Sequence, residues 1–389
     1  MVIYLDHNAT TPVAPSVLEA MTPFLSTEYA NPSSTHEPGR RAGSALDGAR
    51  RRVADFLGAE PGEIVFTGSG SEANNLAIRG AALAAFLRTG RNTVVTQSTE
   101  HPSVLETARA LGRLHGMRIR IVGVDQHGTV DLDALRAHVD EHTAIVSVQV
   151  ANGETGTLQP VAEVVDVARR HGAVVHTDAS QAAGRLPVSV ESLGVDLLTI
   201  AGHKMYGPKG VGVLYRRAGV ELEPMVYGGG QEGGVRSGTQ AVALIVGMAA
   251  ACEVSRQAAS DGGRVRLLRD TLFDAISSGL RNHVCLNGHP TDRLPNTLNI
   301  SVDGVEGHMV LAAAEGLAAS TGSACHSTRH EPSPVLMAMG CSPTRALGAI
   351  RLSLGYTTQA DEVRRAGYLL ARAVTAAAGD SEARQYATS

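Results

Sequence analysis

The sequence lacks the features that would place the protein in a membrane, outside the cell or on nucleic acid. Its longest apolar run, residues 241–254, is too short to span a bilayer and fits a buried helix. The formal net charge is −4, whereas nucleic acid and anionic membranes favour basic partners. The four cysteines follow no disulfide spacing, and no secretory signal opens the chain. We therefore expect a cytoplasmic protein with free thiols.

Internal repeats, low-complexity tracts and flexible linkers are also missing, and the composition is that of a globular protein, with 43% hydrophobic and 19% charged residues. From residue 60 onward, apolar strand patterns alternate with helical periodicity. Strands that read as continuous Val, Ile and Leu runs indicate a mostly parallel sheet covered by helices on both faces. The predicted strands are 63–68, 92–97, 118–124, 144–151, 173–179, 195–202 and 210–217.

The length of 389 residues favours two closely packed domains. After about residue 258 the regular alternation gives way to a mixed pattern of helices and short strands, which predicts a smaller α+β unit. We expect a large domain over 15–258, containing a seven-stranded sheet. The small domain would combine 1–14 with 259–389.

Chemically useful side chains follow the ends of several predicted strands. The ends of parallel strands meet at one edge of a sheet, and ligands bind there. Each residue has an ordinary explanation: Asp178 is also a typical helix cap, and Lys204 could be a solvated loop lysine like Lys209. Five separate elements contribute to this set, which makes a coincidence improbable. The set consists of Ser71, His101, Asn152, Asp178, and His203 with Lys204.

Glycine-rich segments add candidate phosphate contacts. The segment TGSGSEANN, residues 67–75, follows a strand and opens a helix, and free N–H groups at a helix N-terminus bind phosphate. A dinucleotide would call for an acidic residue at the end of the next strand, but that strand ends in Gln97 and Glu100 lies beyond it. A phosphate monoester fits better. The loop 228–239 is either a second phosphate contact or a surface turn.

Together these residues fit one ligand. Lys204 leaves an apolar strand, and low-dielectric surroundings lower a lysine pKa so that the amine can attack a carbonyl carbon. Asp178 offers a carboxylate to a ring nitrogen, and the helix after residue 70 offers N–H groups to a phosphate. Pyridoxal 5′-phosphate (PLP) has the aldehyde, the ring nitrogen and the phosphate that such a site would bind.

The segment STGSACHS, residues 320–327, places Cys325 among small polar residues, although most free cysteines are buried in apolar surroundings. Together with YLDHNATTP, NPSSTHEPGRRA, EHPSV, HTDASQAAG, GHKMYGPKGVG, RSGT and IRLSLG, it occurs in the order typical of cysteine desulfurases. The chain resembles this family over nearly its whole length. The resemblance implies a class V, fold-type I PLP enzyme that acts as a homodimer. It also implies conversion of L-cysteine to L-alanine, with the sulfur left on Cys325 as a persulfide for a protein acceptor.

The resemblance also assigns roles. Lys204 resembles the Schiff-base lysine, Asp178 the partner of the ring nitrogen, and His101 a residue that stacks on the ring and assists proton transfer. Arg351 matches a substrate-carboxylate contact, for which a guanidinium is suited. Cys325, Lys204 and His101 would be catalytic, and either Lys204 or His101 would remove the substrate Cα proton. The remaining residues that match cofactor contacts are Gly70, Ser71, Asn152 (also a substrate contact), Gln181, His203 and, from the partner subunit, Thr239.

Three positions depart from the family pattern: Ala201 stands where a serine usually contacts phosphate, Gly153 where an asparagine is usual and Gly233 where an arginine is usual. Three other functions stay open. The cysteine segment also resembles that of selenocysteine lyases, and the chain could be another class V PLP aminotransferase. A zinc site formed by Cys325, His326, His330 and Cys341 matches no standard zinc spacing. We therefore expect no metal.

Overall fold

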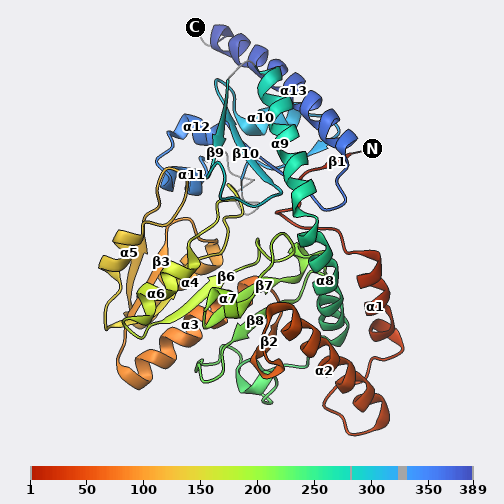
Figure 1. The fold of residues 1–389 in the computed structure, drawn as a ribbon, viewed down its shortest axis with the longest axis vertical. Helices are drawn as coiled ribbons and strands as arrows, with labels where there is room; N and C mark the ends of the chain where they lie inside the picture. The colour runs from red at the N-terminus through yellow and green to blue at the C-terminus, as the bar shows by residue number, and fades with distance from the viewer. Residues whose placement is uncertain (1, 281–282, 323–330, 388–389) are drawn as a thin grey trace.

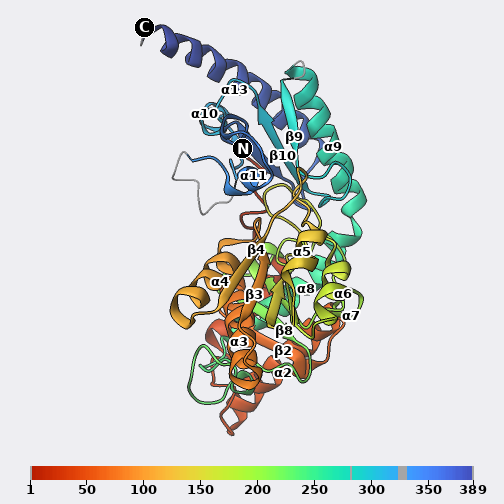
Figure 2. The same ribbon diagram turned by 90° about the vertical axis from the view of Figure 1, so that its left-hand side faces the viewer.

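The computed structural model describes residues 2–280, 283–322 and 331–387, with side chains described to residue 378. Two units follow one another along the long axis of the molecule (Figure 1). The larger unit contains the main sheet, and the smaller unit carries both the N-terminal strand and the C-terminal helix. The view turned by 90° shows the same division, with the small unit above the edge of the large sheet (Figure 2).

Seven strands form the main sheet, and most of them are parallel. Only β8 runs antiparallel to both of its neighbours, β2 and β7. The predicted α/β fold with a mostly parallel seven-stranded sheet is therefore confirmed, and the strand positions agree with prediction to within a few residues. In sheet order the strands are β2 (Ile64–Thr67), β8 (Gly212–Arg216), β7 (Leu197–Ala201), β6 (Val174–Asp178), β5 (Thr143–Ser147), β3 (Thr93–Gln97) and β4 (Arg118–Val122).

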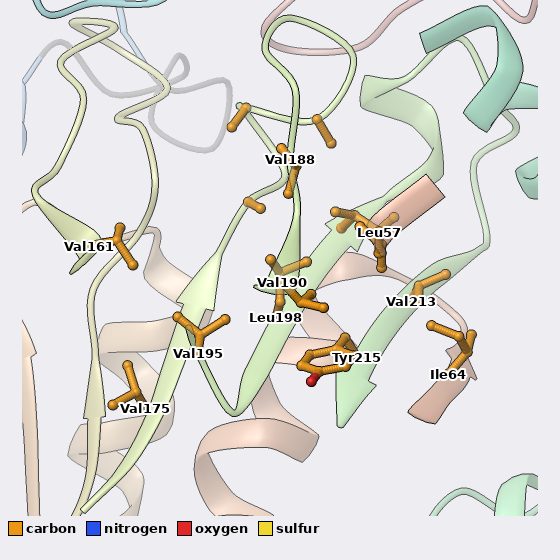
Figure 3. Packing of buried hydrophobic residues seen from close by; sticks show 14 of the residues in the cluster. Leu57, Ile64, Val161, Val175, Val188, Val190, Val195, Leu198, Val213 and Tyr215 are labelled. Carbon is orange, nitrogen blue, oxygen red and sulfur yellow. The ribbon is translucent and has the colours of Figure 1, made fainter. Parts of the chain in front are cut away.

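Helices cover both faces of this sheet because successive strand residues point to opposite sides. In β2, Val65 packs against α3 (Gly70–Thr89) and α4 (Pro102–His115). Ile64 and Phe66 face the other core, which Figure 3 shows in part. The helices on that second side are α2 (Glu37–Leu57), α5 (Leu132–His138), α6 (Val161–Arg169), α7 (Val190–Leu193) and α8 (Val242–Ser260).

Helix α8 is the apolar segment that the sequence predicted to be a buried helix. By length and composition alone it could cross a membrane, but 61% of its apolar window is buried inside the protein. It packs against α1 (Pro15–Ser26) and α2, and a core helix has the same composition as a membrane span. The sequence reading did not identify α1 or α2. Burial explains the apolar composition of α8 without a membrane.

The smaller unit has its own hydrophobic core, formed by a three-stranded antiparallel sheet and two long helices. The sheet order is β12 (Ala349–Ser353), β10 (Thr297–Val302) and β9 (Val284–Asn287). The long helices are α9 (Gly262–Gly279) and α13 (Ala360–Ala387), which pack on each other. Its short elements are α10 (Gly307–Ala313), α11 (Pro334–Ala338) and α12 (Pro343–Leu347).

The N-terminal segment contributes a strand to this smaller unit. Strand β1 (Ile3–Tyr4) pairs in parallel with β11 (Leu317–Ala318), and Ile3 and Leu5 join the core of the small unit. From there the chain runs past both units into the loop before α1. Residues 6–11 are thereby placed next to the carboxyl edge of the large sheet, where the candidate site lies.

Candidate active site

The candidate site lies at the carboxyl ends of β3, β5, β6 and β7, on the side that faces the small unit. Asp178 is the last residue of β6, and Ala201 is the last residue of β7. A single helical turn, Gly202–Lys204, follows β7 and carries His203 and Lys204. These strands end side by side because they are parallel neighbours in the sheet.

Lys204 is half-buried, and its Nζ donates a hydrogen bond to the carbonyl oxygen of Asn8 at 2.6 Å. The same carbonyl accepts a bond from Nε2 of Gln181 at 3.1 Å. Lys209, by contrast, is exposed. Tyr206, two residues after Lys204, is buried and has a backbone φ of 62°. This value is rare for a residue other than glycine. The backbone therefore turns sharply just beyond the amine.

Asp178 is buried, and each of its carboxylate oxygens accepts a hydrogen bond from the protein. Oδ1 accepts from the backbone N–H of Ser180 at 2.8 Å, and Oδ2 accepts from Nδ2 of Asn74 at 2.7 Å. Below it in the same strand, His176 bridges the hydroxyls of Ser147 and Thr199 on the neighbouring strands. Complete burial lowers the pKa of His176 to about 4, so an uncharged ring lies beneath the carboxylate at neutral pH.

Helix α3 begins at the same edge and points its N-terminus toward the strand ends. Ser69 caps it by accepting the N–H of Glu72, while Gly70 is buried and Ser71 is exposed. A side chain at residue 70 would stand 2.9 Å from Cβ of Ala201 and 3.4 Å from Oγ of Ser180. Glycine at residue 70 is therefore needed for the start of α3 to lie this close to the end of β7. A Cβ at residue 70 would thus meet both the Ser180 hydroxyl and Ala201, the residue that stands where the family usually has a serine.

Two histidines lie at the site. His101 caps α4, and its Nδ1 accepts the N–H of Ser103 at 3.1 Å. His203 lies under the N-terminal segment, with Nδ1 3.2 Å from the hydroxyl of Thr10. Burial, aided by the positive charges of Lys204 and Lys209, lowers the pKa of His203 to about 4. His203 is therefore neutral at physiological pH and can donate a hydrogen bond.

The side chain of Asn152 is occupied by its own loop. Its Oδ1 accepts the N–H groups of Glu154 and Thr155, and its Nδ2 donates to the carbonyl of Thr99 at 3.0 Å. Gly153 follows it, and a Cβ there would stand 2.7 Å from Nε2 of Gln181. The glycine that departs from the family pattern therefore lets the Gln181 amide lie against this loop.

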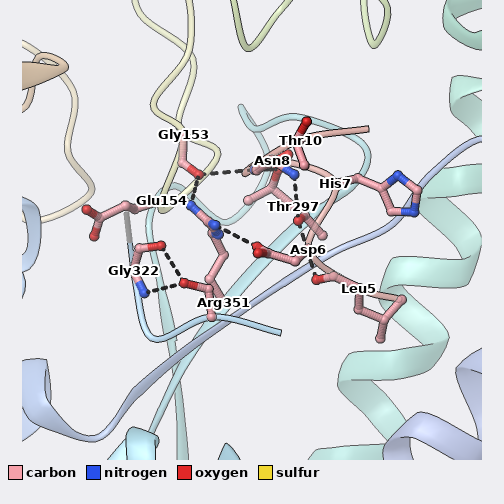
Figure 4. Close-up of polar contacts among 12 residues, drawn as sticks. Leu5, Asp6, His7, Asn8, Thr10, Gly153, Glu154, Thr297, Gly322 and Arg351 are labelled. Carbon is pink, nitrogen blue, oxygen red and sulfur yellow. Dashed lines mark hydrogen bonds and ion pairs between the residues drawn. The ribbon is translucent and has the colours of Figure 1, made fainter. Parts of the chain in front are cut away.

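Arg351 extends from β12 of the small unit toward the large one, with a side chain that is 3% exposed. Its Nη2 donates to Oδ1 of Asp6 at 2.7 Å, and its Nη1 donates to the carbonyl of Gly153 at 3.2 Å (Figure 4). Nε is buried without a hydrogen-bond partner among the described residues. The guanidinium thus lies where both units and the N-terminal segment meet.

Thr239 is exposed at the end of the glycine-rich loop 228–239. The loop is fixed to the large unit by Glu232, whose buried carboxylate accepts two bonds from Arg50 and one from the N–H of Phe66. Arg236 of this loop forms an ion pair with Glu72 in the first turn of α3, with Nε 2.7 Å from Oε1. Gly233 has φ 64° and open space around it.

Cys325, His326 and His330 lie outside the described residues. The described part of the chain contains no group of three or more His, Cys, Asp or Glu side chains that could hold a metal ion. Sequence reasoning gave no role to Asn8, Asn74 or Ser103, although all three make hydrogen bonds inside the site. Asn8 and Ser103 lie in segments whose family resemblance was noted, and Asn74 lies in the candidate phosphate segment 67–75, so the motifs signalled their presence without giving their roles.

The fold and the site define a class of enzyme. An amine and a carboxylate at the carboxyl edge of a parallel sheet, beside a helix N-terminus, fit PLP. The family model for class-V aminotransferases matches residues 3–366, and the chain belongs to this family.

Its relatives are cysteine desulfurases. The chain is 43% identical over 363 residues to the cysteine desulfurase IscS of Dictyoglomus turgidum, covering 92% of this chain and 91% of the relative. A solved NifS-like protein matches with a TM-score of 0.89 and 36% identity, over 96% of this chain and all of the other. A structure of SspA in complex with cysteine matches with a TM-score of 0.79 and 34% identity, over 92% of this chain and 99% of the other. Cysteine desulfurases are PLP-dependent, so the predicted enzyme class and cofactor are confirmed.

Proposed function

We propose that this enzyme transfers the sulfur of L-cysteine to its own Cys325 and releases L-alanine. The observation that supports this most directly is the Lys204 amine, held on the Asn8 carbonyl beside Gln181, within an edge that also carries Asp178. The SspA complex holds cysteine, which makes cysteine the first substrate to test on this chain. The family resemblance supports the persulfide and the homodimer, and the cytoplasmic location stays the expectation made from the sequence composition.

The residues of the edge fit PLP by their chemistry. Lys204 would hold the aldehyde carbon, Asp178 would face the ring nitrogen, and His101 would lie against the ring. The unpartnered Oε1 of Gln181 is a free hydrogen-bonding atom in this edge, among the described residues. The phosphate contacts would come from Gly70, Ser71 and His203, with Ser180 in place of the hydroxyl that Ala201 lacks and Thr239 from the partner subunit.

PLP, when bound, draws electrons away from the carbon next to the substrate nitrogen. Asp178 would favour this by placing its carboxyl group against the ring nitrogen, at the end of β6. Lys204 is the amine that exchanges with the substrate amine and can then take the Cα proton at Nζ. Arg351 and Asn152 would orient the substrate carboxylate. Because the Arg351 guanidinium already bonds Asp6 and Gly153, it is positioned before any substrate arrives.

The sulfur step involves Cys325. Its thiolate attacks the substrate sulfur, the carbon–sulfur bond breaks, and the carbon keeps the bonding electrons and takes a proton. The balance is one thiol and one L-cysteine giving one persulfide and one L-alanine, so no external oxidant enters. A protein acceptor then takes the outer sulfur. Iron–sulfur assembly, tRNA thiolation and DNA phosphorothioation are the acceptor pathways that we would test.

Lys204 and Lys209 are the two lysines of the sequence, which makes the test of cofactor attachment simple. The purified enzyme with PLP should show an absorbance band at about 420 nm, as expected for a cofactor bonded to a lysine. The band should disappear in Lys204→Ala and persist in Lys209→Ala. Loss of the band in both variants, or in neither, would contradict the proposed role of Lys204.

Alanine release tests the sulfur step. Cys325→Ala should lose turnover of cysteine, whereas Cys341→Ala, which removes a free thiol of the described residues, should retain it. Persulfide labelling should follow the same pattern. Turnover of selenocysteine that survives Cys325→Ala would instead identify a selenocysteine lyase. Amino transfer to a keto acid without sulfur release would identify an aminotransferase.

A further inference from the structure

A continuous line of hydrogen bonds connects the carboxylate of Asp178 to the imidazole of His101. The two residues lie on different elements, at the ends of β6 and β3, and Asn74 and Ser103 lie between them. Asn74 is in α3 and 1% exposed, and Ser103 is in the first turn of α4. Two helix N-terminal regions therefore meet through these two side chains.

The first step is the orientation of the Asn74 amide. Its Nδ2 lies 2.7 Å from Oδ2 of Asp178, while its Oδ1 is buried without a partner among the described residues. An ionised carboxylate accepts hydrogen bonds and cannot donate them, so the amide must turn its NH₂ group toward Asp178. The opposite orientation would place two acceptor oxygens against each other in a buried site.

The second step is the hydroxyl of Ser103. The other hydrogen of the Asn74 NH₂ group points to Oγ of Ser103, at 2.9 Å. Ser103 Oγ therefore accepts from Asn74 and has its own hydrogen left to donate. Nδ1 of His101 lies 2.8 Å from the same oxygen, and it is the remaining partner of this hydroxyl among the described residues.

The third step is the protonation state of the ring. Nδ1 of His101 already accepts the backbone N–H of Ser103 at 3.1 Å, because His101 caps α4. Two donors directed at Nδ1 leave no room for a hydrogen on that nitrogen. A neutral imidazole carries one hydrogen, so it must be on Nε2.

We propose that Asn74 and Ser103 are positioning residues that transmit the orientation of Asp178 to His101 and keep the His101 hydrogen on Nε2. This rests on the proposed function, in which His101 lies against the cofactor ring. His101 then offers a hydrogen to the reaction and has no free lone pair to act as a base. The removal of the substrate Cα proton falls to Lys204, and this separates two roles that the sequence left open.

The test is the tautomer of His101 in the holoenzyme. Histidine labelled with ¹⁵N distinguishes a ring nitrogen that carries hydrogen from one that does not, through long-range ¹H–¹⁵N correlation spectra. His101→Gln identifies the His101 signals among those of the 15 histidines. We expect Nδ1 without hydrogen and Nε2 with hydrogen in the wild type. The opposite assignment would overturn the proposal.

Three variants test the line of bonds itself. Asn74→Asp puts a carboxylate beside Ser103, so the hydroxyl turns toward it. Nδ1 of His101 then keeps only the backbone N–H of Ser103, and part of the His101 population should carry its hydrogen on Nδ1. Ser103→Ala should give a mixture of both tautomers, and Ser103→Thr, which keeps the hydroxyl, should restore the wild-type spectrum. Asn75→Ala is the control, since within the described part of the chain the Asn75 side chain bonds only the Ser71 carbonyl, on the exposed side of α3. Ser103→Ala keeps the proposal testable even if Asn74→Asp does not fold.

Kinetics give a second readout. Ser103→Ala should lower kcat by about tenfold or more with little change in KM, as expected when a positioned proton donor is disturbed. A fall in kcat with an unchanged His101 spectrum would reduce Ser103 to a structural role and overturn the proposal. The spectrum does not depend on turnover, so a failure of the desulfurase proposal would be recognised separately by the absence of alanine.

Discussion

Arg351 is the residue that binds together the most distant parts of the site. It extends from the small unit and bonds Asp6 of the N-terminal segment and Gly153 of the large unit. A lysine has a single compact ammonium group and cannot hold both partners and a substrate carboxylate in the same plane. The arrangement therefore predicts that the shape of the guanidinium matters as much as its charge.

Arg351→Lys should raise KM for cysteine by about tenfold or more, equivalent to about 1.4 kcal/mol of binding free energy, with a smaller change in kcat. Alanine release at varied cysteine concentration measures both constants. Arg345→Lys is the matched control, because Arg345 bonds Asn287 and the Leu286 carbonyl away from the site. An unchanged KM in Arg351→Lys would remove Arg351 from substrate binding.

Glu100 is a buried acid next to the predicted catalytic histidine. Burial raises its pKa to about 8, although the N–H of Gln149 and the amide of Gln97 stabilise the charged form. The folded protein therefore keeps a proton that the unfolded chain loses above about pH 4.5. The contribution of neutral Glu100 to the free energy of unfolding is fully present below pH 4.5. It is lost progressively as the pH rises to about 8.

Glu100→Gln keeps one acceptor oxygen and replaces the carboxyl group with an amide that does not titrate. Relative to wild type, its free energy of unfolding should increase progressively between pH 4.5 and 8, by roughly 2–5 kcal/mol in total. Urea unfolding at a series of pH values measures this difference. Glu106→Gln, on the exposed side of α4, is the control for the loss of one carboxylate. A difference that stays constant with pH would contradict a neutral Glu100.

Among the elements, the glycine-rich loop 228–239 shows how one side chain can fix a flexible segment. Glu232 is 1% exposed and bonds Arg50 of α2 together with the backbone of β2. Its own backbone has φ 50°, a conformation that costs energy outside glycine and persists only where its surroundings enforce it. The loop that would present Thr239 to a partner subunit is thus held at its centre.

Glu232→Ala should lower the free energy of unfolding by about 3–5 kcal/mol, because it removes the only carboxylate bonded to Arg50 among the described residues and leaves the buried N–H of Phe66 without this acceptor. It should also speed proteolytic cleavage within 228–239. Glu28→Ala removes the surface partner of Arg41 and should cost no more than about 1 kcal/mol. Equal losses in the two variants would show that Glu232 does not anchor the loop.

The sequence predicted the large sheet well because most of its strands are buried on both faces and rich in apolar residues; the exception is the edge strand β4, RIRIV, which is partly exposed. Helix α2 was missed, although its buried side chains Ala42, Leu46, Ala49, Val53 and Leu57 recur at helical spacing. Many charged residues on its outer face obscured that pattern. The site was predicted as a set of strand-end residues, whereas the Asn74–Ser103 connection depends on how two helices pack, which local periodicity does not encode.

At the scale of the whole molecule, Asn8 is the residue through which the two units share the site. Its side chain bonds Gly153 of the large unit and Thr297 and Asn296 of the small unit, and it is fully buried. Its backbone carbonyl accepts the Lys204 amine. A change in the Asn8 side chain should therefore lower the stability of the protein and also shift the carbonyl that accepts the hydrogen bond from Lys204.

Asn8→Ala should lower the free energy of unfolding by roughly 2–4 kcal/mol, since it removes three hydrogen bonds of a fully buried side chain. It should also weaken PLP binding, measured by titrating cofactor into the apoenzyme. Asn75→Ala removes one exposed amide bond and serves as the control, with an expected cost below about 1 kcal/mol. Wild-type PLP affinity in Asn8→Ala would show that the carbonyl holds its place without the side chain.

The pairing of β1 with β11 has a consequence for the order of events on the ribosome. Residues 3 and 4 leave the ribosome long before their strand partners, residues 317 and 318. Asp6 likewise leaves long before Arg351, with which it forms an ion pair. The large sheet, complete by residue 216, can form much earlier. The nascent protein therefore carries Lys204 long before the β1–β11 pairing and the Asp6–Arg351 ion pair can form, so the part of the site contributed by the small unit is completed only late in synthesis.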